Sequence, residues 1–128
     1  MAVNRIFVVR HGETQANVSG IDAGPLDYPL TKKGKKEIRY LVRLLSRTKI
    51  SAVFSSPIFR TVETAKILAT PHGLHVEIVD ELTDAKLKAK FIGKKGRKHI
   101  LTAPDAFVES YQELENRVVW AIAEIGIP

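Results

Sequence analysis

Arg10 and His11 are the first neighbouring side chains in the sequence that could together transfer a phosphoryl group. They follow residues 3–9, a short run rich in Val, Ile and Phe that predicts a buried strand. A neutral imidazole can attack phosphorus and hold the phosphoryl group covalently, and its ordinary pKa of ~6.5 leaves a neutral fraction at pH 7. A guanidinium offers a planar, permanently charged set of donors to the oxygens of that group. The pair could therefore carry phosphoryl-transfer chemistry, but by itself it is weak evidence, because a lone His after a strand is more often structural.

Other routes to that chemistry are excluded by residue type and spacing. The chain has no cysteine, so a cysteine nucleophile, a thiolate metal site and a disulfide are all excluded. It contains neither a Gly-x4-Gly-Lys-Ser/Thr loop nor an Asp-x-Asp pair suited to magnesium. His72 and His75 are close in sequence, but no carboxylate cluster accompanies them. We expect a reaction without metal or cofactor.

The elements that must position Arg10 and His11 alternate between strands and helices. Residues 52–54 and 75–79 predict two further short strands. Helices are predicted over residues 31–47, with Thr31 as N-cap, from Ser56-Pro57 to a stop at Pro71 and Gly73, and over residues 108–125. This order predicts an α/β protein, a three-layer α/β/α sandwich with a mainly parallel sheet. Ligands of such sheets bind beyond the carboxyl ends of the strands, where Arg10 and His11 would lie.

Length and charge narrow the class of protein further. The 128 residues fit one domain, and the net charge of +6 suits an anionic partner. No apolar stretch could span a bilayer and the N-terminus has no signal-peptide pattern, so a cytoplasmic protein without membrane contact is expected. Part of the charge is gathered in one segment: Lys86, Lys88, Lys90, Lys94, Lys95, Arg97 and Lys98. This basic run could be a solvated loop, line a phosphate pocket, or contact nucleic acid.

A series of short motifs in the same order as in one known family gives a more specific interpretation. The chain resembles the histidine phosphatase (phosphoglycerate-mutase-like) superfamily over residues 5 to about 125. The motifs are Arg10-His11-Gly12-Glu13-Thr14 with Asn17, Pro29-Leu30-Thr31 with Gly34, Ser55-Ser56-Pro57 with Arg60 and Glu63-Thr64-Ala65, Leu82-Thr83-Asp84, and Glu109-Ser110 with Arg117.

The resemblance implies a role for each matching residue. His11 would be the nucleophile, while Arg10, Arg60 and Asn17 would contact the phosphoryl oxygens. Asp84 would be the general acid that protonates the leaving oxygen. The family usually has Glu at that position, so Asp84 is one methylene shorter and Glu81 is the nearby substitute. Glu63 is expected to be structural, orienting Arg60 one helical turn away.

One expected residue of the family is missing. The superfamily uses a second histidine after a later strand, and the sequence ends about where that strand is expected. Pro71-His72-Gly73 imitates the motif but closes a helix, and His99 falls in the basic run. We therefore expect residues 1–128 to form a single domain that is incomplete at its C-terminus and lacks its last core strand. A shortened product, a natural short form, or a homodimer that completes the sheet edge would each explain this.

Several functions remain open. The favoured one is a phosphomonoester hydrolase, acting on a phosphorylated small molecule or phosphoprotein through phospho-His11, and weakened or inactive in this short form. Phosphoglycerate-mutase-type transfer is an alternative, disfavoured because the chain has little beyond the core. A second is a phosphate- or phosphoprotein-binding module without turnover. Nucleic-acid binding ranks last, because the basic run has no interleaved aromatics except Phe91.

Overall fold

The computed structural model describes residues 5–84, 92–95 and 109–126. Its sheet, among the described residues, consists of two parallel strands, β1 (Val53–Ser55) and β2 (Val76–Ile78), with Val53 opposite Val76. Parallel strands need a crossover connection. Here the crossover is the helix α3 (Phe59–Ala69) followed by the short 3₁₀ helix η1 (Thr70–His72). Both strands and their parallel pairing agree with the sequence prediction.

α3 begins later than the sequence predicts. Ser56 was expected to cap the helix with Pro57 at its first position, but the N-cap is Ile58. The Ser56 side chain reaches further into the helix, where its Oγ lies 2.6 Å from Thr61 Oγ1. The predicted stop is confirmed, since Pro71 lies in η1 and Gly73 ends it with a left-handed φ of 67°.

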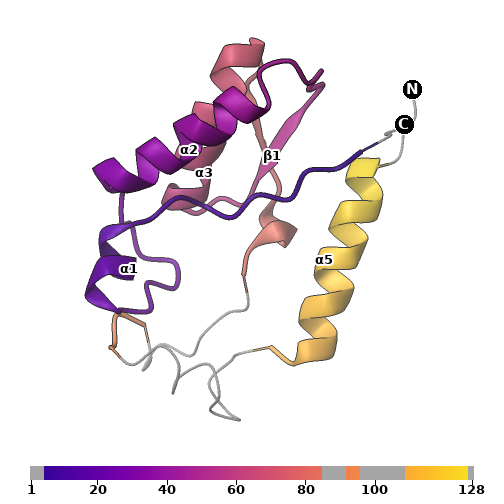
Figure 1. Cartoon of the computed structure of the whole chain (residues 1–128). Coiled ribbons are helices and arrows are strands. Elements are labelled where there is room, and N and C mark those ends of the chain that lie inside the picture. Colours follow the sequence, from indigo (N-terminus) through magenta and orange to yellow (C-terminus); the bar gives the residue numbers. More distant parts are fainter. Residues whose placement is uncertain (1–4, 85–91, 96–108, 127–128) are drawn as a thin grey trace.

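The helix α2 (Lys32–Leu44) packs against α3, as Figure 1 shows. Thr31 caps it as predicted, because its side chain accepts a hydrogen bond from Gly34 N at 3.0 Å. Ile38, with 4% of its surface exposed, is the apolar residue that α2 buries most deeply. The helix ends three residues before the expected Arg47. The exposed ring of Tyr40 lies on its outer face among four charged side chains, those of Lys33, Lys36, Glu37 and Arg43.

The strand predicted over residues 3–9 is wrong for its described part. Residues 5–9 form no hydrogen-bonded ladder, and their side chains are exposed, up to 89% at Val8. A strand exists only through pairing with a neighbour, and no described segment pairs with this one. β-branched composition was therefore insufficient to predict it.

A short helix, α1 (Gln15–Ser19), follows the turn that carries His11. Thr14 caps it, and Gly20 closes it with a φ of 68°. The following loop pairs with the described part of the basic run. Ile21 forms an antiparallel bridge with Lys95, and Asp22 N donates to Lys94 O at 3.0 Å.

The last helix, α5 (Tyr111–Gly126), confirms the prediction for its described residues. It contacts η2 (Asp80–Leu82), a 3₁₀ turn that follows β2, and stands apart from α2 and α3 in Figure 1. Within the described ranges no helix is long and apolar enough to cross a membrane.

Candidate active site

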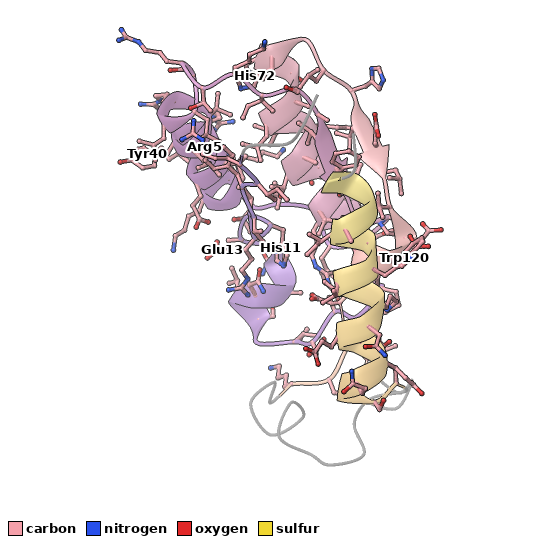
Figure 2. The ribbon with its side chains drawn as sticks, turned by 90° about the vertical axis from the view of Figure 1, so that its right-hand side faces the viewer. Arg5, His11, Glu13, Tyr40, His72 and Trp120 are labelled. Carbon is pink, nitrogen blue, oxygen red and sulfur yellow. The ribbon has the colours of Figure 1, made fainter. Side chains whose placement is uncertain are left out.

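His11 lies in the turn between the extended N-terminal segment and α1, and Figure 2 places it in the middle of the molecule. Its Nδ1 is 2.7 Å from the carbonyl oxygen of Gly12. A carbonyl can only accept, so Nδ1 must carry the proton when the ring is neutral. That tautomer leaves the lone pair on Nε2, and Nε2 is therefore the nitrogen that could attack phosphorus.

The surroundings of His11 favour the neutral ring. Partial burial lowers the pKa of His11 below 6.5, and the positive charges of Arg60 and Arg10 lower it further. The hydrogen bond to Gly12 and the negative charge of Asp84 act in the opposite direction. The net shift is downward. Arg10, Arg60 and Asp84 therefore all lie near enough to act electrostatically on the imidazole.

A buried hydroxyl joins the His11 turn to α3. Gly12 N donates to Thr64 Oγ1 at 3.2 Å, and that hydroxyl donates to Arg60 O at 2.8 Å. Thr64 is 4% exposed. One threonine thus fixes the His11 turn to the helix that carries Arg60.

The turn also touches α2 through two glycines. A Cβ built on Gly12 would lie 2.7 Å from the carbonyl oxygen of Gly34, closer than real Cβ atoms approach. A Cβ on Gly34 would overlap the backbone of Glu13. The two backbones can cross at this separation only because neither residue has a side chain.

Thr64→Val is expected to destabilise the fold by about 1–3 kcal/mol, because it leaves the buried Gly12 N–H without an acceptor. Urea unfolding followed by circular dichroism measures this loss. Thr70→Val is the matched control, since the exposed Thr70 donates the same kind of hydrogen bond to the carbonyl four residues earlier, that of Lys66, at 2.7 Å. Its cost should stay within about 0.5 kcal/mol. Equal losses for both variants would show that the Gly12 contact contributes nothing.

Arg60 enters the site from the first turn of α3. It is 8% exposed, and its Nη1 donates to Gly24 O at 2.9 Å. Arg10 directly precedes His11 in the chain and is exposed. The structure thus brings both arginines near His11, one held rigidly by the protein and one on the surface.

Asn17 has a structural partner in this structure. Its Oδ1 accepts hydrogen bonds from Thr14 N at 2.9 Å and Thr14 Oγ1 at 3.0 Å, and so completes the cap of α1. The amide Nδ2 forms no hydrogen bond with a described residue, so it could still donate to a phosphate. The phosphate contact expected for Asn17 stays a prediction.

Glu63 is engaged by groups other than the one expected. Its Oε2 accepts from Leu30 N at 3.1 Å, and its Oε1 lies 3.7 Å from Lys35 Nζ. These contacts join α3 to the start of α2. The contacts of Glu63 are thus structural, but they link α3 to α2, whereas the expected contact was with Arg60.

Asp84 follows η2 with an exposed side chain. Its backbone is contacted by Arg117 of α5, which also contacts Glu81 and Thr83. Sequence reasoning missed this contact, although Arg117 and Glu109 were both noted as motif residues. No local pattern in the sequence indicated that Arg117 would contact residues 81–84, which lie 33 to 36 positions away.

His72 lies in η1, at the opposite end of α3 from Arg60, and Figure 2 shows it far from His11. His99, residues 86–91 and residues 96–98 lie outside the described residues. Within the described ranges, no group of three or more His, Cys, Asp or Glu side chains could hold a metal ion.

This geometry agrees with a family identified by sequence comparison. The model of the histidine phosphatase superfamily (branch 1) matches residues 6–126. The chain belongs to that superfamily.

The relatives include phosphatases and a probable mutase. The adenosylcobalamin/alpha-ribazole phosphatase of Escherichia coli K12 is 35% identical over 80 residues, which are 62% of this chain and 39% of that protein. A probable phosphoglycerate mutase GpmB of Escherichia coli O139:H28 is 29% identical over 124 residues, 97% of this chain and 54% of the relative. The chain thus spans about half the length of the curated relatives it matches.

Solved structures show the same fold. The alpha-ribazole phosphatase of Shigella flexneri superposes with a TM-score of 0.77 at 27% identity, covering 91% of this chain and 64% of that protein. Bacillus stearothermophilus YhfR gives a TM-score of 0.78 at 24% identity, over 91% and 64% of the two chains. The protein therefore has the phosphoglycerate-mutase-like fold, of which the described residues contain helices and a small parallel sheet.

Proposed function

We propose that this protein is a metal-independent phosphomonoester hydrolase that works through a phosphohistidine on His11. The observation that carries the proposal is the state of the imidazole. Its Nδ1 proton is held by Gly12 O, which leaves Nε2 unprotonated, and burial together with Arg60 and Arg10 lowers its pKa. These are the properties that a nitrogen nucleophile between two phosphate-binding arginines requires.

The reaction would proceed in two balanced steps. Nε2 of His11 attacks phosphorus, the ester P–O bond breaks, and Asp84 gives its proton to the leaving oxygen. Water then attacks the phosphohistidine, Asp84 takes a proton from that water, and the N–P bond breaks to release phosphate. Arg60 and Arg10 would stabilise the negative charge on the equatorial oxygens in both steps.

Substrate recognition would use the basic run. Residues 92–95 pair with the loop that receives the Arg60 hydrogen bond, since Gly93 N donates to Asp22 O and Arg60 Nη1 donates to Gly24 O. Lys94 and Lys95 are exposed on this loop. They would attract phosphorylated small molecules or phosphoproteins to the site.

The names of the relatives support a phosphatase and also leave a mutase open. The Escherichia coli and Shigella flexneri proteins are named for alpha-ribazole phosphatase activity, whereas the GpmB proteins are named probable phosphoglycerate mutases. Mutase-type transfer therefore stays an alternative. We also propose that the fold is a three-layer α/β/α sandwich with a mainly parallel sheet.

Trapping of the intermediate tests the proposed function. The protein is mixed with p-nitrophenyl phosphate, quenched in alkali, and digested for mass spectrometry. We expect a base-stable, acid-labile phosphoryl group on the peptide that contains His11. Orthovanadate should suppress its formation. Vanadate binding without any phosphohistidine would overturn the hydrolase and favour the phosphate-binding module.

A further inference from the structure

Arg117, on the second turn of α5, makes a dense set of polar contacts. Its Nε and Nη2 bind both carboxylate oxygens of Glu109, at 3.3 and 2.7 Å. Its Nη1 donates to Glu81 O and Thr83 O, each at 2.6 Å, and Nη2 also reaches Asp84 O at 3.5 Å. One guanidinium thus joins α5 to three carbonyl groups of the segment that carries Asp84.

This guanidinium has no donor left for a substrate. Arginine has five N–H groups in a fixed plane, and the five contacts use all of them. The side chains of Arg117 and Glu109 are only 18% and 13% exposed, and their two-point contact fixes the orientation of the fork. Arg117 is therefore suited to hold the protein backbone and unsuited to bind phosphate.

The segment it holds needs such an anchor. After η2, residues 83 and 84 belong to no helix or strand. The Asp84 side chain is exposed, so its position depends on the backbone that carries it. A short aspartate cannot compensate for a displaced backbone as a longer side chain could.

We propose that Arg117, oriented by Glu109, is a positioning residue that sets the backbone of residues 81–84 so that Asp84 can protonate the leaving group. This inference rests on the proposed function. Its alternative is a merely structural role, in which Arg117 only attaches α5 to the rest of the chain. The two differ in how the reaction depends on the leaving group, because a general acid matters most when the leaving oxygen is strongly basic.

The experiment compares the rate of His11 phosphorylation by phenyl phosphate and by 2,4-dinitrophenyl phosphate. Arg117→Lys keeps the positive charge but loses the fork. We expect it to slow the reaction of phenyl phosphate by about 10- to 100-fold and that of the dinitrophenyl ester by less than about threefold. Glu109→Gln should give the same pattern. Val118→Ala, half-buried on the next position of α5, is the control and should affect both substrates equally.

Equal slowing of both substrates by Arg117→Lys, or no slowing of either, would overturn the inference. Hydrogen exchange of the amides of residues 79–84 provides an independent measurement, and we expect faster exchange in Arg117→Lys than in Val118→Ala. Unchanged exchange would also overturn it. If the unaltered protein forms no phosphohistidine with either ester, the proposed function itself fails. Failure of this inference alone leaves phosphohistidine formation intact.

Discussion

His11→Ala is expected to abolish phosphohistidine formation and to lower turnover of p-nitrophenyl phosphate by at least about 1,000-fold, because it removes the proposed nucleophile. Arg60 and Arg10 would still bind phosphate, so the affinity for vanadate should fall much less than turnover. Steady-state hydrolysis and vanadate titration by calorimetry measure the two effects separately. The contrast between them is the sign of a nucleophile rather than of a binding residue.

His75→Ala is the control for this variant. His75 is exposed and lies just before β2, so the substitution removes the same kind of side chain at a position outside the site. Its turnover should stay within about twofold of the unaltered protein. Full turnover by His11→Ala would show that the reaction does not pass through His11.

Arg60→Ala is the second substitution with a large expected effect, a fall of about 100- to 1,000-fold in kcat/KM. The side chain is buried and fixed by Gly24 O, so its donors are preorganised for a phosphoryl group. Arg60→Lys retains the charge but not the planar fork and should recover only part of the loss. Arg43→Ala, at an exposed position on α2, is the control and should change kcat/KM little.

The same variant has a predictable effect on pH dependence. In the proposed mechanism the neutral form of His11 attacks phosphorus. Its pKa lies below 6.5, so activity should persist as the pH falls through 6.5 and be lost only as the pH falls through that lowered pKa. Removal of Arg60 takes away a positive charge that lowers this pKa. The acid-side loss should therefore move to higher pH in Arg60→Ala. NMR titration of the His11 ring checks this directly, and an unchanged or lower pKa would contradict the electrostatic coupling.

Some of this structure could be predicted from local sequence. The cap at Thr31, the strand at residues 53–55 and the stop at Gly73 each depend on a few neighbouring residues, and all three were confirmed. The segment 5–9 could not be predicted in the same way, because a strand requires a partner. The start of α3 was misplaced since Ser56 bonds Thr61 instead of capping the helix.

In the candidate site, too, the residue types could be predicted from the sequence, whereas the contacts between them could not. The types of Arg10, His11 and Arg60 suggested phosphoryl chemistry directly, and the family motifs named Asp84. The tautomer of His11 depends on Gly12 O, and the anchoring of residues 81–84 depends on Arg117, up to 36 positions away. These contacts depend on how the folded chain places its backbone, so no local sequence pattern could predict them.

The crossing of Gly12 and Gly34 provides a rule for recognising related sequences. An Arg-His-Gly triplet occurs by chance in many chains, and by itself it identifies little. A second glycine at the third position of α2, the position of Gly34, is an independent requirement, because a larger residue there would push the His11 turn away from α2. A search that demands both glycines, whatever the residues between them, selects for the backbone geometry that presents His11.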